Sequence, residues 1–274
     1  MRTPKSTQIP GVALLLLAMA FSIFPLLSML STALQPQGTV PSGLSWPSDP
    51  QWHNFIDAWN VADITTLAGS SFLLVLGVVP LGVLLATMAG YALGQLRIPG
   101  GSIFFVLLLL GLTLPFEVTI VPLYYQIREM GLLNTRLGLI LPLIGLNLPF
   151  AVFWMRAHFL NAPAELSEAS SMDGASAWQS FRAIHLPLAL PAIASLALLM
   201  FISTWNQFLL AIVLMDDPEK RTMAGALQNF VGQYSTDVVL LNAGSLLIMA
   251  PMILVFLFFQ RHIVKAMLAG SVKG

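Results

Sequence analysis

Six long apolar stretches constrain the fold of this chain more than any other feature. They cover about residues 11–34, 67–93, 103–124, 137–158, 188–215 and 240–259. A helix of about 20 apolar residues is long enough to cross the hydrocarbon core of a bilayer. Only 9% of the 274 residues are charged, which is too few to cover the surface of a soluble domain. The sequence therefore predicts an all-α integral membrane protein, a single bundle of six transmembrane helices over residues 1–274.

Lysine and arginine are shared unequally between the two sides of such a bundle. If the N-terminus is inside, eight lie on the inner side: Arg2, Lys5, Arg97, Arg156, Arg182, Arg261, Lys265 and Lys273. Four lie on the outer side: Arg128, Arg136, Lys220 and Arg221. Short cytoplasmic loops are enriched in basic residues. We therefore expect both termini to be cytoplasmic.

Several classes of function are disfavoured by what the sequence lacks. Twelve basic and twelve acidic residues leave no net charge, which argues against a nucleic-acid partner. There is no cysteine and the four histidines are scattered, so we expect no metal site. No span carries a Ser/His, H-E-x-x-H or paired-Asp arrangement, so we do not expect an intramembrane enzyme. A G-x-x-x-x-G-K-[ST] phosphate loop is also missing, so ATP, if it drives the protein, binds to another chain.

Three small residues of the second span recur at intervals of four. They are Ala86, Gly90 and Gly94. Small residues at this spacing form a smooth stripe on one helix face, against which a second helix can pack closely. The stripe predicts a packed bundle and not a set of independent anchors.

A polar segment lies between the fourth and fifth apolar stretches. Residues 161–187 have the pattern of two short helices joined by a bend. Asn161 can cap the first helix, and Pro163 suits its first turn, where a missing N–H costs nothing. Gly174 then breaks the pattern, because glycine readily adopts the left-handed conformation that ends a helix.

The second helix of this segment has its own start and stop signals. Ser176 and Gln179 have the spacing of a capping box, and Pro187 is expected to stop the helix before the next span. Its apolar face is expected to consist of Trp178, Phe181 and His185. An amphipathic helix of this kind either lies flat on the membrane or fills a groove on a soluble partner. Arg182 is its only basic residue, which disfavours the membrane and favours the partner.

The same segment resembles the cytoplasmic loop of ABC importer permeases, whose pattern is E-A-A, three residues, G, nine residues, I-x-L-P. Here Glu168-Ala169-Ser170 is followed by Gly174 and then by Ile184-His185-Leu186-Pro187, with both gaps matching. Ser170 in place of the second alanine is the one departure. We call residues 159–187 the coupling loop.

Further stretches are similar to one branch of this family, the carbohydrate-uptake permeases related to the smaller membrane subunit of the maltose transporter. They are GLLNTRLGLILP (131–142), STWNQFLLAIVL (203–214), DDPEKRTMAGALQNF (216–230) and the C-terminal FFQRHIVKAMLAGSVKG. The resemblance covers most of the chain from about residue 69. It implies a permease subunit of an ATP-driven importer that carries a sugar or a related solute across the plasma (inner) membrane of a prokaryote.

The resemblance also implies partners and roles. The partners are a second permease, two ATPase subunits that bind ATP and magnesium, an extracytoplasmic solute-binding protein and membrane lipid, with no cofactor on this chain. The residues expected to contact the ATPase or to shape the loop are Glu168, Ala169, Ser170, Met172, Asp173, Gly174, Ala175, Phe181, Ile184 and Pro187. Phe181 and Ile184 would fill the groove of the ATPase. The outer loop, residues 216–237, either reaches into the binding protein or is a plain solvated loop.

Two further polar features lie within apolar stretches. Trp205, Asn206 and Gln207 interrupt the fifth stretch, and they either line a solute path or hold neighbouring helices together. Glu117 lies near the outer end of the third stretch. An acid at such a position is a candidate functional residue, either a proton or ion site or, as we favour, an acid hydrogen-bonded between helices. Because of Glu117, an ion-coupled secondary transporter or channel without an ATPase is kept as the alternative.

Overall fold

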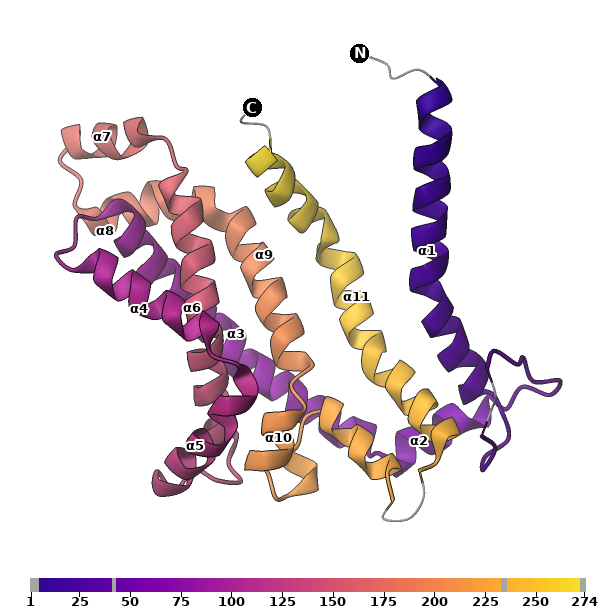
Figure 1. Ribbon diagram of the computed structural model, residues 1–274. Coiled ribbons are helices and arrows are strands. Elements are labelled where there is room, and N and C mark those ends of the chain that lie inside the picture. The colour runs from indigo at the N-terminus through magenta and orange to yellow at the C-terminus, as the bar shows by residue number, and fades with distance from the viewer. Residues whose placement is uncertain (1–4, 41–42, 233–235, 272–274) are drawn as a thin grey trace. The chain divides into compact units, whose positions relative to one another are not determined.

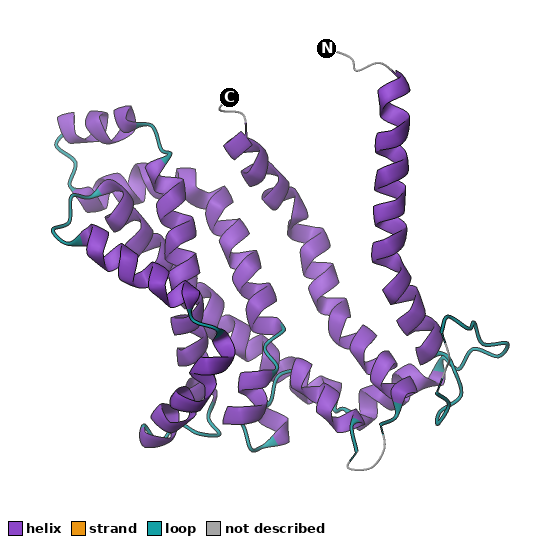
Figure 2. Cartoon of the chain, viewed as in Figure 1, coloured by secondary structure: helices purple, strands orange, loops and turns teal. Residues whose placement is uncertain are grey.

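The computed structural model describes residues 5–40, 43–232 and 236–271, and the described chain is helical without a β-strand (Figure 2). The long helices are α1 (Lys5–Ala33), α3 (Ile64–Gln95), α6 (Arg136–Leu160), α9 (Leu186–Trp205) and α11 (Val238–Ser271). The shorter helices are α2 (His53–Val61), α4 (Gly101–Thr113), α5 (Phe116–Glu129), α7 (Ala164–Met172), α8 (Ala177–Ser180) and α10 (Leu209–Leu214). A π-helical turn, η1 (Phe181–His185), joins α8 to α9, and 3₁₀ turns cover Pro218–Lys220 and Ala224–Phe230.

Among the described residues, five helical segments are long and apolar enough to cross a membrane. They are Gly11–Ala33, Ile64–Gln95, Arg136–Leu160, Ala177–Trp205 and Val238–Gln260. The bent pair α4 and α5 makes a sixth if it is counted as one span. The predicted fold class, an all-α membrane bundle, is confirmed.

The third apolar stretch, 103–124, is not one continuous helix. Its two helices meet at an angle of 103°. The break lies at Leu114 and Pro115, where Leu114 is extended with φ −76° and ψ 124°. Proline disfavours helical geometry in the residue before it, so α4 ends at Thr113 and a new helix starts at Phe116.

The fifth apolar stretch, 188–215, is also not one continuous helix. Its helix ends at Trp205 and a separate short helix, α10, follows from Leu209. The side chain of Gln207 accepts a hydrogen bond of 3.2 Å from the Leu210 N–H, which satisfies a donor at the start of α10. The Thr222 hydroxyl donates to the Gln207 carbonyl at 2.6 Å, and this bond stabilises the turn between α9 and α10.

The chain forms two compact units, residues 1–65 with 226–251 and residues 66–225 with 252–274. In the first unit, α2 is tied to the end of α1 by the buried side chain of Asn54. Its amide donates to the carbonyls of Ala33 and Gln35, each at 2.8 Å. The chain between α1 and α3 is therefore fixed at the end of a long apolar helix.

In the second unit, α3, α6 and α9 form the core. The large buried side chains include Leu74, Leu143, Met155, Leu196 and Met200. The predicted small-residue stripe is confirmed at this contact, because a Cβ atom on Gly90 would lie 2.6 Å from Met155 Cβ and 2.8 Å from the Arg156 nitrogen. Only glycine allows the two backbones to approach this closely.

Candidate coupling site

The coupling loop folds at one end of α6 and α9. Figure 1 shows α7 and α8 at that end, with α5 and α10 toward the opposite end. Gly174 forms the bend between α7 and α8 with a φ of 72°, as the sequence predicted. The N–H groups of Gly174 and Ala175 donate to Ser171 and Ser170 carbonyls at 3.1 and 3.0 Å, which closes the end of α7.

The predicted capping box is confirmed at the start of α8. The Ser176 N–H donates to Gln179 Oε1 at 2.7 Å, and the Gln179 N–H donates to Ser176 Oγ at 3.4 Å. The two side chains therefore satisfy donors at a helix start that has only four residues of regular α-helix.

The predicted cap of α7 is wrong. Asn161 belongs to the end of α6, where its side-chain amide donates to the Ala157 carbonyl at 2.8 Å. Pro163 precedes the first helical residue, Ala164, and takes an extended ψ of 129°. The carbonyls left free at the end of α6 compete for the asparagine amide, which the sequence pattern did not reveal.

The predicted stop at Pro187 is also wrong, because the helix runs through it from α8 to α9. A proline in a regular α-helix removes the bond to the carbonyl four residues earlier and clashes with it. Here the preceding turn is a π-helix, and the Leu186 N–H donates to the Phe181 carbonyl five residues earlier. The wider turn makes room for the proline ring without ending the helix.

Most of the predicted contact residues of the loop are exposed. Met172, beside the bend, has 90% of its surface exposed. The other exposed residues are Glu168, Ala169, Asp173, Gly174 and Pro187, while Ala175 and Ile184 are half-buried. The bend therefore presents an apolar methionine between carboxylates on one small surface.

Two predicted contact residues are buried inside this chain. The ring of Phe181 is 4% exposed and lies 4.8 Å from the ring of Tyr91 on α3. It therefore cannot fill the groove of another protein, and the expectation for Phe181 is wrong. Ser170 is buried against Ser180, with the two hydroxyl oxygens 3.0 Å apart. The exposed aromatic residue of the loop is Trp178 instead, which the sequence placed on the same apolar face but not among the residues expected to contact the ATPase.

The end of α3 contributes residues that sequence reasoning missed. The Tyr91 hydroxyl donates to the Ala177 carbonyl at 3.1 Å, and Gln95 Oε1 accepts from the Ser167 hydroxyl at 2.9 Å. Tyr91 and Gln95 are four residues apart and share one face of α3. Two polar side chains at this spacing, at the end of an apolar run, are the signal that could have identified them.

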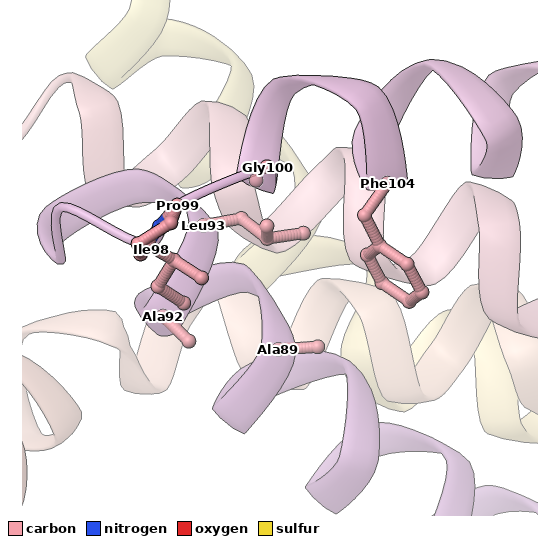
Figure 3. A pocket seen from close by; sticks show the side chains of 8 residues that line it. Ala89, Ala92, Leu93, Ile98, Pro99, Gly100 and Phe104 are labelled. Atoms are coloured by element: carbon pink, nitrogen blue, oxygen red, sulfur yellow. The ribbon is translucent and has the colours of Figure 1, made fainter.

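A shallow apolar hollow lies beside the same end of α3 (Figure 3). Its volume is about 270 Å³, and Ala89, Ala92 and Leu93 of α3 line it together with Ile98, Pro99 and Phe104. With almost no polar lining, it offers a sugar nothing to hydrogen-bond. Within the described residues, no group of three or more His, Cys, Asp or Glu side chains could hold a metal ion.

The predicted solute-path residues Trp205, Asn206 and Gln207 do not line one common surface. Trp205 is 4% exposed and its ring stacks on that of Phe201, so it shows no face to a solute. Gln207 caps α10, and Asn206 is exposed, with its amide 3.2 Å from the Met252 sulfur. The helix-holding interpretation therefore fits Gln207.

Glu117 lies in the first turn of α5, directly after the bend. Its side chain is exposed and makes no hydrogen bond or ion pair with any residue that the structure describes. The arrangement that we favoured, an acid hydrogen-bonded between helices of this chain, is therefore not found.

The first part of the outer loop is not a plain solvated loop. The Met223 N–H donates to the Ser71 hydroxyl at 2.7 Å, and the Ser70 hydroxyl donates to the Lys220 carbonyl at 3.0 Å. At its exposed edge, Lys220 pairs with Asp217 at 3.2 Å. The hydrogen bond from Lys220, then that from the Glu219 N–H, lowers the pKa of Asp217 below 3.8.

Comparison with known protein families identifies a family match for most of the chain. Residues 79–269 match the family described as the binding-protein-dependent transport system inner membrane component. This range includes α4 to α10, the whole coupling loop and most of α3 and α11.

Individual relatives are similar in sequence to nearly the whole chain. The diacetylchitobiose uptake system permease protein NgcG of Streptomyces coelicolor is 34% identical, over 94% of this chain and 87% of that protein. The trehalose transport system permease protein SugB of Mycobacterium tuberculosis is also 34% identical, over 94% of this chain and 95% of that protein.

A solved structure shares the fold. The crystal structure of a bacterial ABC transporter involved in the import of the acidic polysaccharide alginate contains a chain that aligns with a TM-score of 0.76 and 24% identity. The alignment covers 95% of this chain and 99% of that chain. With the bundle of apolar helices and the matched family, it follows that this chain belongs to the binding-protein-dependent transport system inner membrane components and is a multi-pass permease subunit of an ABC importer.

Proposed function

We propose that this permease subunit imports a sugar or a related solute, driven by ATP hydrolysis on partner subunits. The observation that carries the proposal is the bend at Gly174. It exposes Glu168, Met172 and Asp173 on one surface, while the remainder of the loop is bound to the ends of α3 and α9. An exposed bend of this kind can dock in a groove on another protein without changing its own fold.

The docking partner in this proposal is an ATPase subunit on the cytoplasmic side. Two ATPase subunits bind ATP and magnesium, and they act on this chain and on a second permease. The excess of lysine and arginine on the side of the coupling loop supports a cytoplasmic position for the loop and for both termini. In docking, Met172 supplies the apolar contact, Glu168 and Asp173 meet basic groups, and Ile184 and Trp178 line the flank.

The solute class rests on the relatives. NgcG, SugB and the arabinooligosaccharides transport system permease protein AraQ of Halalkalibacterium halodurans are named for a diacetylated disaccharide, a disaccharide and oligosaccharides. We extend carbohydrate uptake to this chain. The solute-binding protein would deliver the sugar at the outer face, where residues 216–237 are its proposed contact. Of the proposed path residues, Asn206 and Glu117 have exposed side chains.

The first experiment is to tag the chain, extract it from native membranes in mild detergent and measure the mass of the intact complex. We expect one second permease and two copies of an ATPase subunit. In vesicles, the complex should take up labelled disaccharide only with ATP and the binding protein present. A chain that is recovered alone or as a homo-oligomer, with uptake driven by an ion gradient, would overturn the proposal. It would also direct attention to Glu117.

A further inference from the structure

Three polar side chains from three separate elements meet beneath the coupling loop. Ser167 is in α7, His185 ends η1, and Gln95 ends α3. Ser167 Oγ lies 2.9 Å from Gln95 Oε1 and 3.1 Å from His185 Nε2. The Gln95 amide nitrogen in turn donates to the Phe159 carbonyl at the end of α6. We call Gln95, Ser167 and His185 the polar junction.

The direction of each bond in the junction follows from the inventory of donors and acceptors. Gln95 Oε1 can only accept, so the single hydroxyl hydrogen of Ser167 points to it. Ser167 Oγ must then accept from His185, which places the ring hydrogen on Nε2 and leaves Nδ1 without one. His185 Nδ1 is one of two buried side-chain atoms that have no partner among the described residues, the other being Thr204 Oγ1. A neutral histidine with a bare Nδ1 is the form that this geometry selects.

A second contact ties the other arm of the loop to the same helix. The Tyr91 hydroxyl donates to the Ala177 carbonyl at the start of α8. The Tyr91 ring lies 4.8 Å from the ring of Phe181 and 5.2 Å from that of His185. The last turns of α3 therefore hold α7 through Gln95 and α8 through Tyr91.

The way the loop joins the spans makes this connection important. The π-helical turn makes the loop continuous with α9, and within the loop three residues, 161–163, link α7 to the end of α6. The helix α3 has no such covalent link, because Gln95 and Ser167 are 72 residues apart in the sequence. Movement of the loop therefore reaches α3 through noncovalent contacts, which are the polar junction, the Tyr91 contacts and the close packing of α3 against α6.

We propose that the polar junction makes α3 part of the body that moves with the coupling loop, so that docking of an ATPase displaces α3 together with α9. This inference rests on the proposed function. Gln95, Ser167 and His185 are positioning residues in it, since they act through the loop and are not expected to touch ATP or solute.

The chain contains no cysteine, which allows the inference to be tested with spin labels at introduced cysteines. One label replaces exposed Glu165 of α7 and the other replaces exposed Met88 of α3. The labelled chain is assembled into the whole transporter, and the distance between the labels is measured without nucleotide and with ATP. In the wild type and in Ser171→Ala, a serine on the same helix, the distance should be equal in the two states.

In Ser167→Ala and in Gln95→Met, the distance distribution should change on addition of ATP, because the loop then moves without α3. Solute uptake per ATP hydrolysed should fall roughly fivefold, as expected for the loss of one buried hydrogen bond from the moving body. Ser167→Thr retains the hydroxyl and should restore both values.

Two results would overturn the inference. One is an unchanged distance and an unchanged coupling ratio in both Ser167→Ala and Gln95→Met. The other is loss of the ATPase subunits from these variants but not from Ser171→Ala, which would mean that the junction only folds the loop. Failure of the proposed function is recognised separately, since the wild-type chain would then carry no ATPase at all.

Discussion

The hydroxyl oxygens of Ser170 and Ser180 lie 3.0 Å apart inside the bend of the coupling loop. Ser170 also donates to the Ser167 carbonyl at 2.9 Å, so its hydrogen is used there and Ser180 is the donor of the pair. Ser170 is the residue at which this chain departs from the E-A-A pattern of the family. The departure thus provides a hydrogen bond between the two arms of the loop.

Ser170→Ala should therefore destabilise the closed loop although it restores the family pattern. The buried Ser180 hydroxyl loses its acceptor, which costs about 1–2 kcal/mol. Ser170→Ala with Ser180→Ala should cost less than the sum of the single changes, because no orphaned donor remains. Amide hydrogen exchange of residues 164–180 measures the local opening free energy. Strictly additive effects would contradict the direct bond.

At Gly174 the backbone conformation, and not the room for a side chain, limits which residues can replace the glycine. A Cβ atom there would meet nothing within 4 Å, but the φ of 72° is unfavourable for most residues. Gly174→Val should strain the bend and reduce ATP-dependent uptake by about tenfold, whereas Gly174→Asn should retain most of it, because asparagine tolerates this conformation. Equal losses in the two variants, measured in vesicles with equal amounts of inserted protein, would point to contact with the partner instead.

Met172 is the most exposed apolar side chain of the bend, which makes it the expected anchor of docking. Met172→Ala should weaken binding of the ATPase subunit by about tenfold, a value common for a central interface residue. Met130, which follows α5 and is 57% exposed, provides the matched control. Titration of purified ATPase onto the reconstituted permease pair measures both affinities. The prediction fails if Met130→Ala weakens binding as much as Met172→Ala does.

The close contact of α3 and α6 predicts opposite effects for two glycines of the same helix. Gly90→Ala places a methyl group against the backbone of Met155 and Arg156, and it should destabilise the bundle by about 1–3 kcal/mol. Gly69→Ala adds a methyl group to open space, so it should be neutral or slightly stabilising. Thermal unfolding of the two variants in the same detergent compares them. A neutral Gly90→Ala would show that the helices can separate at little cost.

The Asp217–Lys220 pair predicts a pH dependence in the outer loop. Because the pKa of Asp217 is lowered in the folded loop, the pair stabilises the turn fully above pH 3.8 and loses this contribution as the pH falls through the lowered value. Asp217→Asn should remove this acid-sensitive contribution while its side-chain oxygen still accepts from the Glu219 N–H. A carboxyl NMR titration of labelled aspartate tests the direction. A midpoint at or above 3.8 would contradict it.

Local signals in the sequence identified the elements of the coupling loop that depend on nearby residues. The bend at Gly174 and the capping box of Ser176 and Gln179 involve partners within a few positions, so spacing alone predicted them. The glycine stripe of α3 was predictable for the same reason, since helix periodicity fixes which residues share a face.

Features that depend on distant partners or on competing backbone geometries were not predictable in this way. Phe181 is buried because Tyr91 lies across from it, 90 positions earlier in the chain. Proline signals were ambiguous, since Pro115 breaks a helix whereas Pro142, Pro149 and Pro187 do not. What differs at Pro187 is the π-helical turn before it, a choice of hydrogen bonding that residue types alone do not specify.

The break between α4 and α5 has a consequence for the life of the subunit before assembly. The last carbonyls of α4 have no helical partners, apart from the Leu110 carbonyl, which accepts from the Thr113 hydroxyl at 2.8 Å. Lipid offers no hydrogen-bond donors, so uncapped peptide groups at membrane depth need water or another protein beside them. A newly made copy whose bend faces only lipid would therefore leave these carbonyls unpaired. Its lifetime in the cell would depend on how soon water or a partner subunit reaches them.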